Sequence, residues 1–141
     1  MGADRAIHLS DRKFAGADTL ATSNAIAGAL RMLDFDLVIT GRQAIDGDTA
    51  QVGPQIAEHL DLPQVTYVEN LEFDGDKLFT IRKSTEEGYQ TVQVESPCVV
   101  TVLATANKAR YMSVRGIVEA YDGKWKSGIL IISVWMKLNW D

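Results

Sequence analysis

The stretch 36–62 changes the spacing of its apolar residues partway along. Leu37–Thr40 is a short unbroken apolar and β-branched run, which predicts a strand buried on both faces of a parallel sheet. Gly41–Gly47 follows as a loop with glycine at both ends. Beyond the loop, apolar residues recur every fourth position, as on one face of a helix: Val52, Ile56 and Leu60. We therefore predict a strand, a loop and a helix, with Asp48 as the N-cap of the helix and Gln51 completing a capping box.

The pattern before this stretch predicts one more strand and one more helix. Ala6–Leu9 reads as the strand, and Thr19–Leu33 as a helix with Asp18 as its N-cap. The buried stripe of that helix consists of Ile26, Leu30 and Leu33. Strand, helix, strand and helix in this order predict a right-handed parallel arrangement within one sheet.

The pattern after Pro63 predicts an antiparallel excursion. Val65–Val68 reads as a strand, and Asp74-Gly75 is a hairpin turn between apolar runs. A second turn, 86–88, leads into the alternating strand Tyr89–Glu95. Cys98–Leu103 is an unbroken apolar strand that returns to the sheet interior and makes Cys98 a buried, inert thiol.

Together these elements predict an α/β fold. We expect a Rossmann-like sheet with a parallel core, helices on both faces and an antiparallel hairpin excursion. Ser113 is placed to cap a final helix whose apolar residues fall on one side: Val114, Ile117, Val118 and Tyr121.

Composition narrows the classes of function. The chain has 141 residues, of which 46% are hydrophobic, as expected for one globular domain. A net charge of −5 without a basic cluster argues against a nucleic-acid surface. One cysteine and two histidines give no disulfide and no convincing zinc site. Because neither a signal peptide nor an apolar run long enough for a membrane helix is present, we expect a cytoplasmic protein.

A strand, a glycine-containing loop and a helix N-terminus form a favourable socket for a phosphate group, because free N–H groups and the helix dipole point toward it. Arg42 adds a positive charge and Thr49 a hydroxyl. Asp46 and Asp48 would repel a phosphate if they pointed at it, so we expect Asp48 to cap the helix and Asp46 to brace the loop or accept a ribose hydroxyl. Without the dinucleotide fingerprint or the Walker loop, the pattern leaves open an ordinary strand–loop–helix connection.

The segment 41–54, GRQAIDGDTAQVGP, resembles the nucleotide-binding loop of the electron transfer flavoprotein β subunit. Residues 1–8, 81–101 and 106–111 resemble further segments of that family in the same order. The resemblance covers residues 1–121, which we interpret as a nucleotide-binding α/β domain truncated at its N-terminus, since the family has two further strand–helix units before it. Residues 122–141 form an atypical tail to which we assign no function.

The resemblance implies an electron-carrier subunit that binds AMP structurally, or a second FAD in the electron-bifurcating branch of the family, which residues 46–54 resemble more. It pairs with an α subunit, which carries the electron-transferring FAD, and passes electrons between a donor and an acyl-CoA dehydrogenase-type flavoenzyme. The backbone N–H groups of residues 48–52 would bind phosphate, and Gly47 and Gly53 would allow close approach. The cofactor-binding residues implied are Gly41, Arg42, Gln43, Ala44, Ile45, Asp46, Gly47, Asp48, Thr49, Ala50, Gln51 and Val52.

The resemblance also implies a docking segment for the partner dehydrogenase. Its residues are Ala106, Asn107, Lys108, Arg110 and Tyr111. Ala106 stands near a position where the family often has leucine, which leaves the strength of docking open. Without the resemblance, the same residues would be interpreted as a capped surface loop.

No catalytic or metal-binding residues are predicted, because neither a nucleophile–base pair nor a metal-ligand set can be assembled. The alternative function is a stand-alone adenine-nucleotide-binding regulatory module, which the loop alone would permit. If the chain is a truncated subunit, we expect it to bind AMP or FAD more weakly than a complete subunit.

Overall fold

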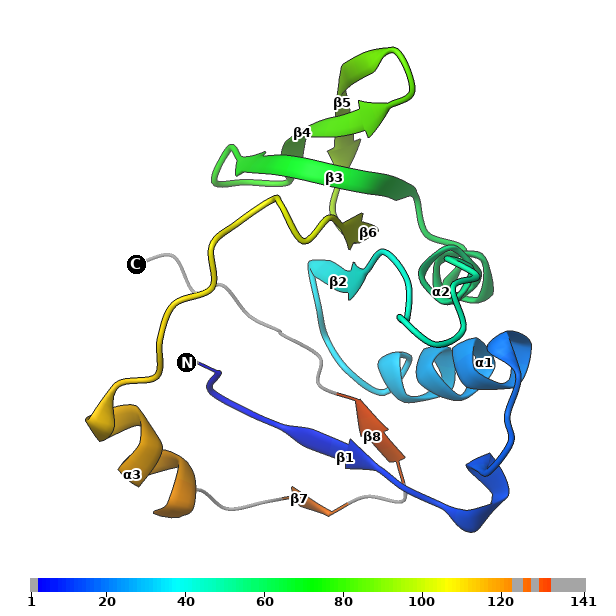
Figure 1. Ribbon diagram of the computed structural model, residues 1–141, viewed down its shortest axis with the longest axis vertical. Helices are drawn as coiled ribbons and strands as arrows, with labels where there is room; N and C mark the ends of the chain where they lie inside the picture. The colour runs from blue at the N-terminus through cyan, green and yellow to red at the C-terminus, as the bar shows by residue number, and fades with distance from the viewer. Residues whose placement is uncertain (1–2, 123–125, 128–129, 133–141) are drawn as a thin grey trace.

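A computed structural model describes residues 3–122, 126–127 and 130–132, and its main sheet has five strands. The sheet order is β2-β6-β3-β4-β5 (Figure 1). The bounds are β2 (Leu37–Gly41), β6 (Cys98–Val102), β3 (Gln64–Phe73), β4 (Leu78–Thr85) and β5 (Gly88–Glu95). β2, β6 and β3 are parallel, whereas β3, β4 and β5 are antiparallel. This mixed sheet with its helices confirms the predicted α/β class.

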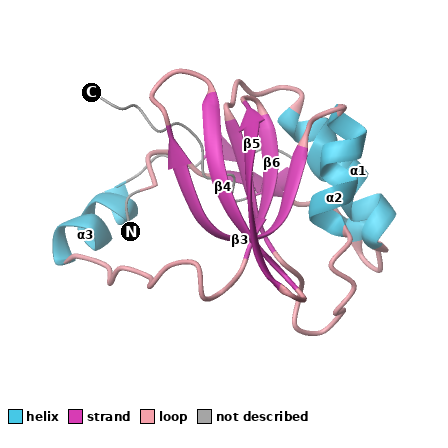
Figure 2. Ribbon diagram, turned by 90° about the horizontal axis from the view of Figure 1, so that it is seen from above, coloured by secondary structure: helices cyan, strands magenta, loops and turns pink. Residues whose placement is uncertain are grey.

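Two of the three α-helices pack together on one side of the main sheet. α1 (Thr19–Leu30) and α2 (Val52–Leu60) lie side by side there, whereas α3 (Val114–Asp122) lies on the other side (Figure 2). A 3-10 turn, η1 (Arg12–Phe14), precedes α1. The N-cap predicted for α1 is confirmed, because the Asp18 carboxylate accepts a hydrogen bond of 2.8 Å from the backbone N–H of Ala21. α1 ends at Leu30, three residues before the predicted end.

The strand β1 (Ile7–Leu9) lies outside the main sheet. It pairs in parallel with β7 (Lys126–Ser127) and antiparallel with β8 (Leu130–Ile132), as Figure 1 shows at the foot of the molecule. The prediction that β1, α1 and β2 form a parallel unit of one sheet is therefore wrong. An extended strand edge pairs with whatever strand lies beside it, and here short strands from the tail occupy the edges of β1.

The core lies on both faces of the main sheet. Alternate residues of the buried strand β6 point in opposite directions, so Cys98 and Val100 belong to one apolar cluster and Val99 to the other. The cluster around Val99 packs against α1 and α2 through Leu30 and Ile56, both of which are almost fully buried. The opposite cluster extends along the antiparallel strands. Both faces of β2 and β6 are therefore covered near the start of these strands, as their unbroken apolar runs predict.

The antiparallel excursion contains both predicted turns. β3 and β4 join through Asp74-Gly75, and β4 and β5 through residues 86–87. The Asp74 carboxylate accepts hydrogen bonds from the N–H groups of Asp76 and Leu78, which lower the pKa of Asp74. The strand predicted at Val65–Val68 and the run before the first turn form one strand, β3, with irregular pairing in its middle.

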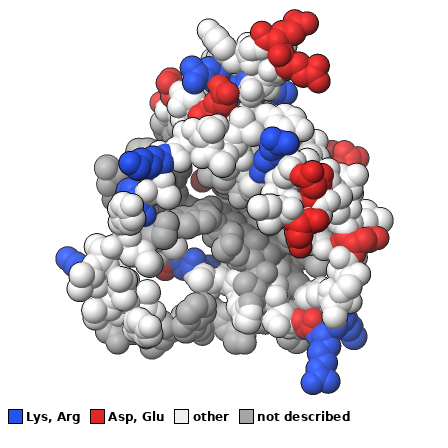
Figure 3. Space-filling view, in the orientation of Figure 1, with Lys and Arg blue, Asp and Glu red and all other residues white. Residues whose placement is uncertain are grey.

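The surface charges do not form a basic patch on the face drawn in Figure 3. Lysine and arginine side chains are scattered there among aspartates and glutamates. None of the helices in the described residues has the length and apolarity needed to cross a membrane.

Candidate functional site

A cavity of about 670 Å³ lies at the carboxyl end of β2, where the chain leaves the sheet and enters α2. Its walls come from α1, from the end of β2, from the loop after β2 and from the first turn of α2. Ligands of open α/β sheets bind at this edge, and pockets for small molecules have volumes of about 300–1,000 Å³. The residues lining the cavity are Thr19, Ile26, Leu30, Val38, Ile39, Thr40, Gly41, Arg42, Gln43, Ala44, Gly47, Thr49, Ala50, Gln51, Val52, Gly53, Ile56 and Val102.

The cavity gathers most of the cofactor-binding residues implied by the sequence. Gly41–Ala44, Gly47 and Thr49–Val52 all line it, whereas Ile45, Asp46 and Asp48 do not. The Ile45 side chain is fully exposed to solvent. The loop thus brings polar and backbone groups to the cavity and keeps its two carboxylates out of the lining.

Both loop carboxylates are engaged within the loop itself. The Asp46 carboxylate accepts a hydrogen bond of 2.9 Å from the backbone N–H of Gly47, as expected for a loop brace. The Asp48 carboxylate accepts a hydrogen bond from the side-chain amide of Gln43. Because neither aspartate lines the cavity, an anion in it would not face these carboxylates directly.

The prediction that Asp48 caps α2 within a capping box is wrong. α2 begins at Val52, and its N-cap residue, Gln51, makes no side-chain capping bond. An N-cap residue has extended backbone, but Asp48 and Ala50 have φ angles of 50° and 53°, in the left-handed region. The chain therefore stays in a tight loop through Ala50 and enters the helix later than the apolar periodicity suggests.

The late start of α2 changes which backbone donors face the cavity. The N–H of Asp48 donates to the carbonyl of Ala44 at 3.0 Å, so it serves the loop. The first N–H groups of a helix have no intrahelical partner, and at this helix they belong to Val52 and Gly53, since Pro54 has none. The N-terminal end of the helix dipole adds a partial positive charge.

The N-terminal residues of both helices meet at the cavity. The hydroxyl of Thr19, the first residue of α1, donates a hydrogen bond of 3.0 Å to the side-chain carbonyl of Gln51. Sequence reasoning did not assign Thr19 to the site. A threonine at a helix start gave no signal, because its proximity to Gln51 depends on how α1 packs against α2.

Arg42 is the cationic residue of the cavity lining, and two neighbours hold its side chain. Its Nε donates a hydrogen bond of 3.0 Å to the side-chain carbonyl of Gln43, whose amide nitrogen in turn donates to Asp48. Its guanidinium carbon lies 5.6 Å from the centroid of the Tyr67 ring, within cation–π distance. Sequence reasoning did not assign Tyr67 either, since strand β3 is distant in sequence from the loop.

The docking segment implied by the sequence lies on the surface between β6 and α3. Asn107, Lys108, Arg110 and Tyr111 are exposed, and the Tyr111 side chain is 96% exposed. Ala106 is half-buried, and its N–H donates to the carbonyl of Leu103. None of these residues lines the cavity, so binding at the cavity and docking at this segment would use different surfaces.

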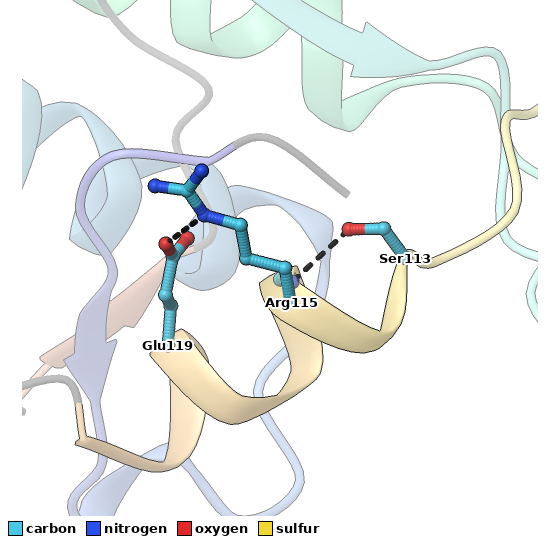
Figure 4. Close-up of polar contacts among 4 residues, drawn as sticks. Ser113, Arg115 and Glu119 are labelled. Carbon is cyan, nitrogen blue, oxygen red and sulfur yellow. Dashed lines mark hydrogen bonds and ion pairs between the residues drawn. The ribbon is translucent and has the colours of Figure 1, made fainter.

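The helix that follows the docking segment carries its own stabilising contacts. The Ser113 hydroxyl accepts a hydrogen bond of 3.0 Å from the N–H of Gly116, which confirms the predicted cap (Figure 4). Arg115 and Glu119, one turn apart, form an exposed ion pair with a 2.6 Å distance between Nε and Oε1. Exposed pairs of this kind stabilise a helix only slightly.

The described residues offer no metal-binding group of three or more histidine, cysteine or acidic side chains. Cys98 is fully buried, and burial raises the pKa of its thiol to about 11. The thiol therefore stays protonated at neutral pH, as the sequence predicts for an inert cysteine.

Comparison with known proteins identifies the family. Residues 1–125 match the electron transfer flavoprotein domain. The chain is 58% identical over 126 residues to the electron transfer flavoprotein subunit beta of Clostridium acetobutylicum, covering 89% of this chain and 48% of that protein. It is 53% identical over 124 residues to the protein of the same name from Thermoanaerobacterium thermosaccharolyticum, covering 88% and 47%.

A third relative is named as part of a larger complex. The caffeyl-CoA reductase-Etf complex subunit CarD of Acetobacterium woodii is 51% identical over 123 residues, covering 86% of this chain and 47% of that subunit. The chain thus spans about half the length of the relatives it matches. Since the family match extends over most of its residues, the chain belongs to the electron transfer flavoprotein domain family.

Proposed function

We propose that the cavity at the end of β2 binds the phosphate and ribose part of an adenine nucleotide, either AMP or the corresponding part of FAD. The observation that carries the proposal is the meeting of Arg42, Thr49 and the N-terminus of α2 in one cavity, from which both loop carboxylates are withdrawn. A guanidinium, a hydroxyl and free helix N–H groups are donors suited to phosphate oxygens.

The apolar part of the cavity suits the rest of such a ligand. Ile26, Leu30, Val38 and Ile39 line it. Small-molecule pockets are mostly apolar, with a few placed polar groups that fix orientation. An adenine ring against the apolar wall and a phosphate at the α2 N-terminus would match this division. AMP and FAD share these groups, so the cavity accommodates the shared part of both.

In this proposal the chain contributes to electron transfer by binding and orienting a nucleotide. Flavin, where it is bound, supplies the redox chemistry. The protein supplies position and electrostatics. The relatives' names, subunit beta and a subunit of a reductase-Etf complex, support a heterodimer of this chain with an electron transfer flavoprotein α subunit. In this proposal an acyl-CoA dehydrogenase-type partner docks at the segment that the sequence resemblance implies, which is Ala106, Asn107, Lys108, Arg110 and Tyr111.

We expect the chain alone to bind nucleotide weakly. β2 is an edge strand of the main sheet, and Ile39 on it is 40% exposed although it lines the cavity. The cavity is therefore open to solvent along this edge. Additional polypeptide on that side, from the α subunit or from a longer chain, would exclude water and strengthen polar contacts to a phosphate.

Calorimetric titration with AMP and then FAD, in the presence and absence of an α subunit, tests the proposal. Binding that requires or is strengthened by the α subunit is the expected result, and the preferred ligand would distinguish AMP from FAD. Tight AMP binding unaffected by the α subunit would favour the stand-alone regulatory module. Absence of binding to either ligand in every mixture would contradict the proposal.

The variant Arg42→Glu provides a control for the position of the ligand. Arg42 is exposed, so its replacement should leave the circular-dichroism spectrum unchanged while weakening AMP binding at least tenfold. Thr49→Trp, which would fill part of the cavity, should have the same effect. Unchanged affinity for AMP in both variants would show that the ligand binds at another site.

A further inference from the structure

Tyr67 has an unusual backbone conformation for a residue inside a strand. Its φ is 58°, in the left-handed region. Such an angle in a bulky residue is an outlier that destabilises the chain unless its surroundings enforce it. The pairing of β3 with β6 shifts register between Val65 and Val68, on either side of this residue. Tyr67 therefore sits at a local bend of β3.

The bend is fixed by the neighbouring strand. The backbone N–H of Tyr67 donates a hydrogen bond of 3.2 Å to the hydroxyl of Thr101, on β6. Thr101 is almost fully buried, and its methyl group faces the first turn of α2 at Gly53. The left-handed conformation is thus anchored to a buried side chain at the carboxyl end of the parallel strands.

The Tyr67 ring lies beside Arg42, which lines the cavity, rather than in the core. The residue remains 40% exposed, and its ring lies 5.6 Å from the guanidinium carbon of Arg42. Arg42 follows β2 and Tyr67 lies on β3, and β6 separates these two strands in the sheet. Gly41 on β2 and Val68 on β3 both pair with Val102 on β6. The ring and the guanidinium therefore meet across the end of β6, at the level where β2 and β6 end.

The position of the ring explains how a long and exposed arginine is held. Gln43 engages Nε of Arg42, and the ring of Tyr67 lies against the guanidinium. An arginine held in this way loses less conformational freedom when it binds an anion.

We infer that Tyr67 is a positioning residue, which holds the Arg42 guanidinium ready for the phosphate of the bound nucleotide. This inference rests on the proposed function, because it assigns a further residue to the same cavity. Tyr67 acts through Arg42 and need not touch the ligand. Its strained backbone is the structural cost of placing an aromatic ring at this point.

Three variants separate the ring from the backbone. Tyr67→Phe keeps the ring and removes only the hydroxyl. Tyr67→Leu removes the ring and leaves the backbone strain. Tyr67→Gly removes the ring and relieves the strain, because glycine adopts positive φ readily, so this variant should be at least as stable as Tyr67→Leu.

The first readout is the Nε–H signal of Arg42 in a ¹H–¹⁵N spectrum of the full chain, assigned by its loss in Arg42→Lys. A ring current from Tyr67 should shift this signal. We expect the shift to persist in Tyr67→Phe and to disappear in Tyr67→Leu and Tyr67→Gly. A signal that is the same in all four proteins would overturn the inference.

The second readout is the ratio of the Kd of adenosine to that of AMP, measured for the chain with the α subunit. We expect Tyr67→Leu and Tyr67→Gly to weaken AMP binding about threefold to tenfold and to leave adenosine binding unchanged, with Tyr67→Phe close to the unaltered chain. An equal loss of affinity for AMP and for adenosine, or no loss of affinity for either, would contradict a role through the phosphate. Absence of AMP binding by the unaltered chain would instead overturn the proposed function and with it the phosphate role.

Discussion

Gly53 packs so closely against Thr101 that no side chain fits between them. A Cβ atom at Gly53 would lie 2.6 Å from Cγ2 of Thr101 and also 2.6 Å from the hydroxyl oxygen of Thr40. The first turn of α2 therefore lies directly on β2 and β6. This contact holds the loop and the helix N-terminus in place at the cavity.

We expect Gly53→Ala to lower the free energy of unfolding by about 1–3 kcal/mol, because the added methyl group forces the helix away from the strands. Chemical denaturation measures this loss. Gly28→Ala is the matched control, since Gly28 is also helical and nothing lies within 4 Å of its added Cβ. In that control the free energy of unfolding should rise by about 0.5–1 kcal/mol, because alanine is more stable than glycine inside a helix. Equal stability of the two variants would contradict the close packing of α2.

The left-handed backbone of Ala50 predicts an unusual effect of glycine. We expect Ala50→Gly to raise the free energy of unfolding by up to about 1 kcal/mol, because relief of the φ of 53° outweighs the greater freedom of glycine in the unfolded chain. Ala44→Gly, in the same loop, should lower the free energy of unfolding by about 0.4–1 kcal/mol. Ala44 is not among the described residues with positive φ, so glycine relieves no strain there and only adds freedom to the unfolded chain. If both variants lost stability, Ala50 would not be left-handed in solution.

The buried thiol of Cys98 predicts a pH dependence of stability. Burial raises the pKa in the folded state from 9.0 to about 11, so the unfolded chain releases its proton at lower pH than the folded chain. The stability that this group contributes is complete below pH 9 and is lost as the pH rises toward 11, at up to about 1.4 kcal/mol per pH unit.

Denaturation of the unaltered chain and of Cys98→Ala between pH 8 and pH 11 tests this effect. The variant should be less stable at pH 8 because it leaves a small cavity. The difference in the free energy of unfolding between the two proteins should narrow as the pH rises. A difference in the free energy of unfolding that stays constant across this pH range would show that the thiol is not shielded from water. Alkylation of Cys98 at pH 8 should likewise require unfolding.

The exposed side chain of Tyr111 predicts an effect on binding without an effect on folding. Tyr111→Ala should change the free energy of unfolding by no more than about 0.5 kcal/mol. It should weaken the complex with an acyl-CoA dehydrogenase-type flavoenzyme about fivefold or more, because exposed tyrosines frequently dominate interfaces.

Surface plasmon resonance with the chain bound to its α subunit measures this affinity. Tyr89→Ala on β5 is the control, because Tyr89 is also exposed but lies on the antiparallel excursion. If the two tyrosine variants weakened docking equally, the segment that includes Tyr111 would not be the docking surface.

Local patterns in the sequence predicted most of the elements. The unbroken run Leu37–Thr40 forms the parallel strand β2, although β2 lies at the sheet edge and only Leu37 and Val38 are buried. Asp74-Gly75 forms a hairpin turn, because a tight turn depends on neighbouring residues alone. The same holds for the helix caps at Asp18 and Ser113, each of which bonds a backbone N–H within its own first turn.

The errors concern features that depend on distant parts of the chain. The sequence predicts β1 in a parallel arrangement with β2, but the partners of β1 are β7 and β8, near the end of the sequence. Asp48 fits the sequence rule for an N-cap, yet its own left-handed backbone and that of Ala50 keep the chain in the loop until α2 begins at Val52. The predicted nucleotide loop does line a cavity. Thr19 lines the same cavity only because α1 packs against α2, and Tyr67 reaches Arg42 only because of the way its strand pairs with β6.

The most direct test of the proposed site follows the backbone N–H signals of the chain, with its α subunit, during titration with AMP. If the phosphate binds at the N-terminus of α2, the largest chemical-shift changes should fall on Thr49–Gly53 and on Arg42. The strands β4 and β5 should remain unchanged. Changes confined to other parts of the chain, or none at saturating AMP, would contradict the assignment of this cavity as the nucleotide site.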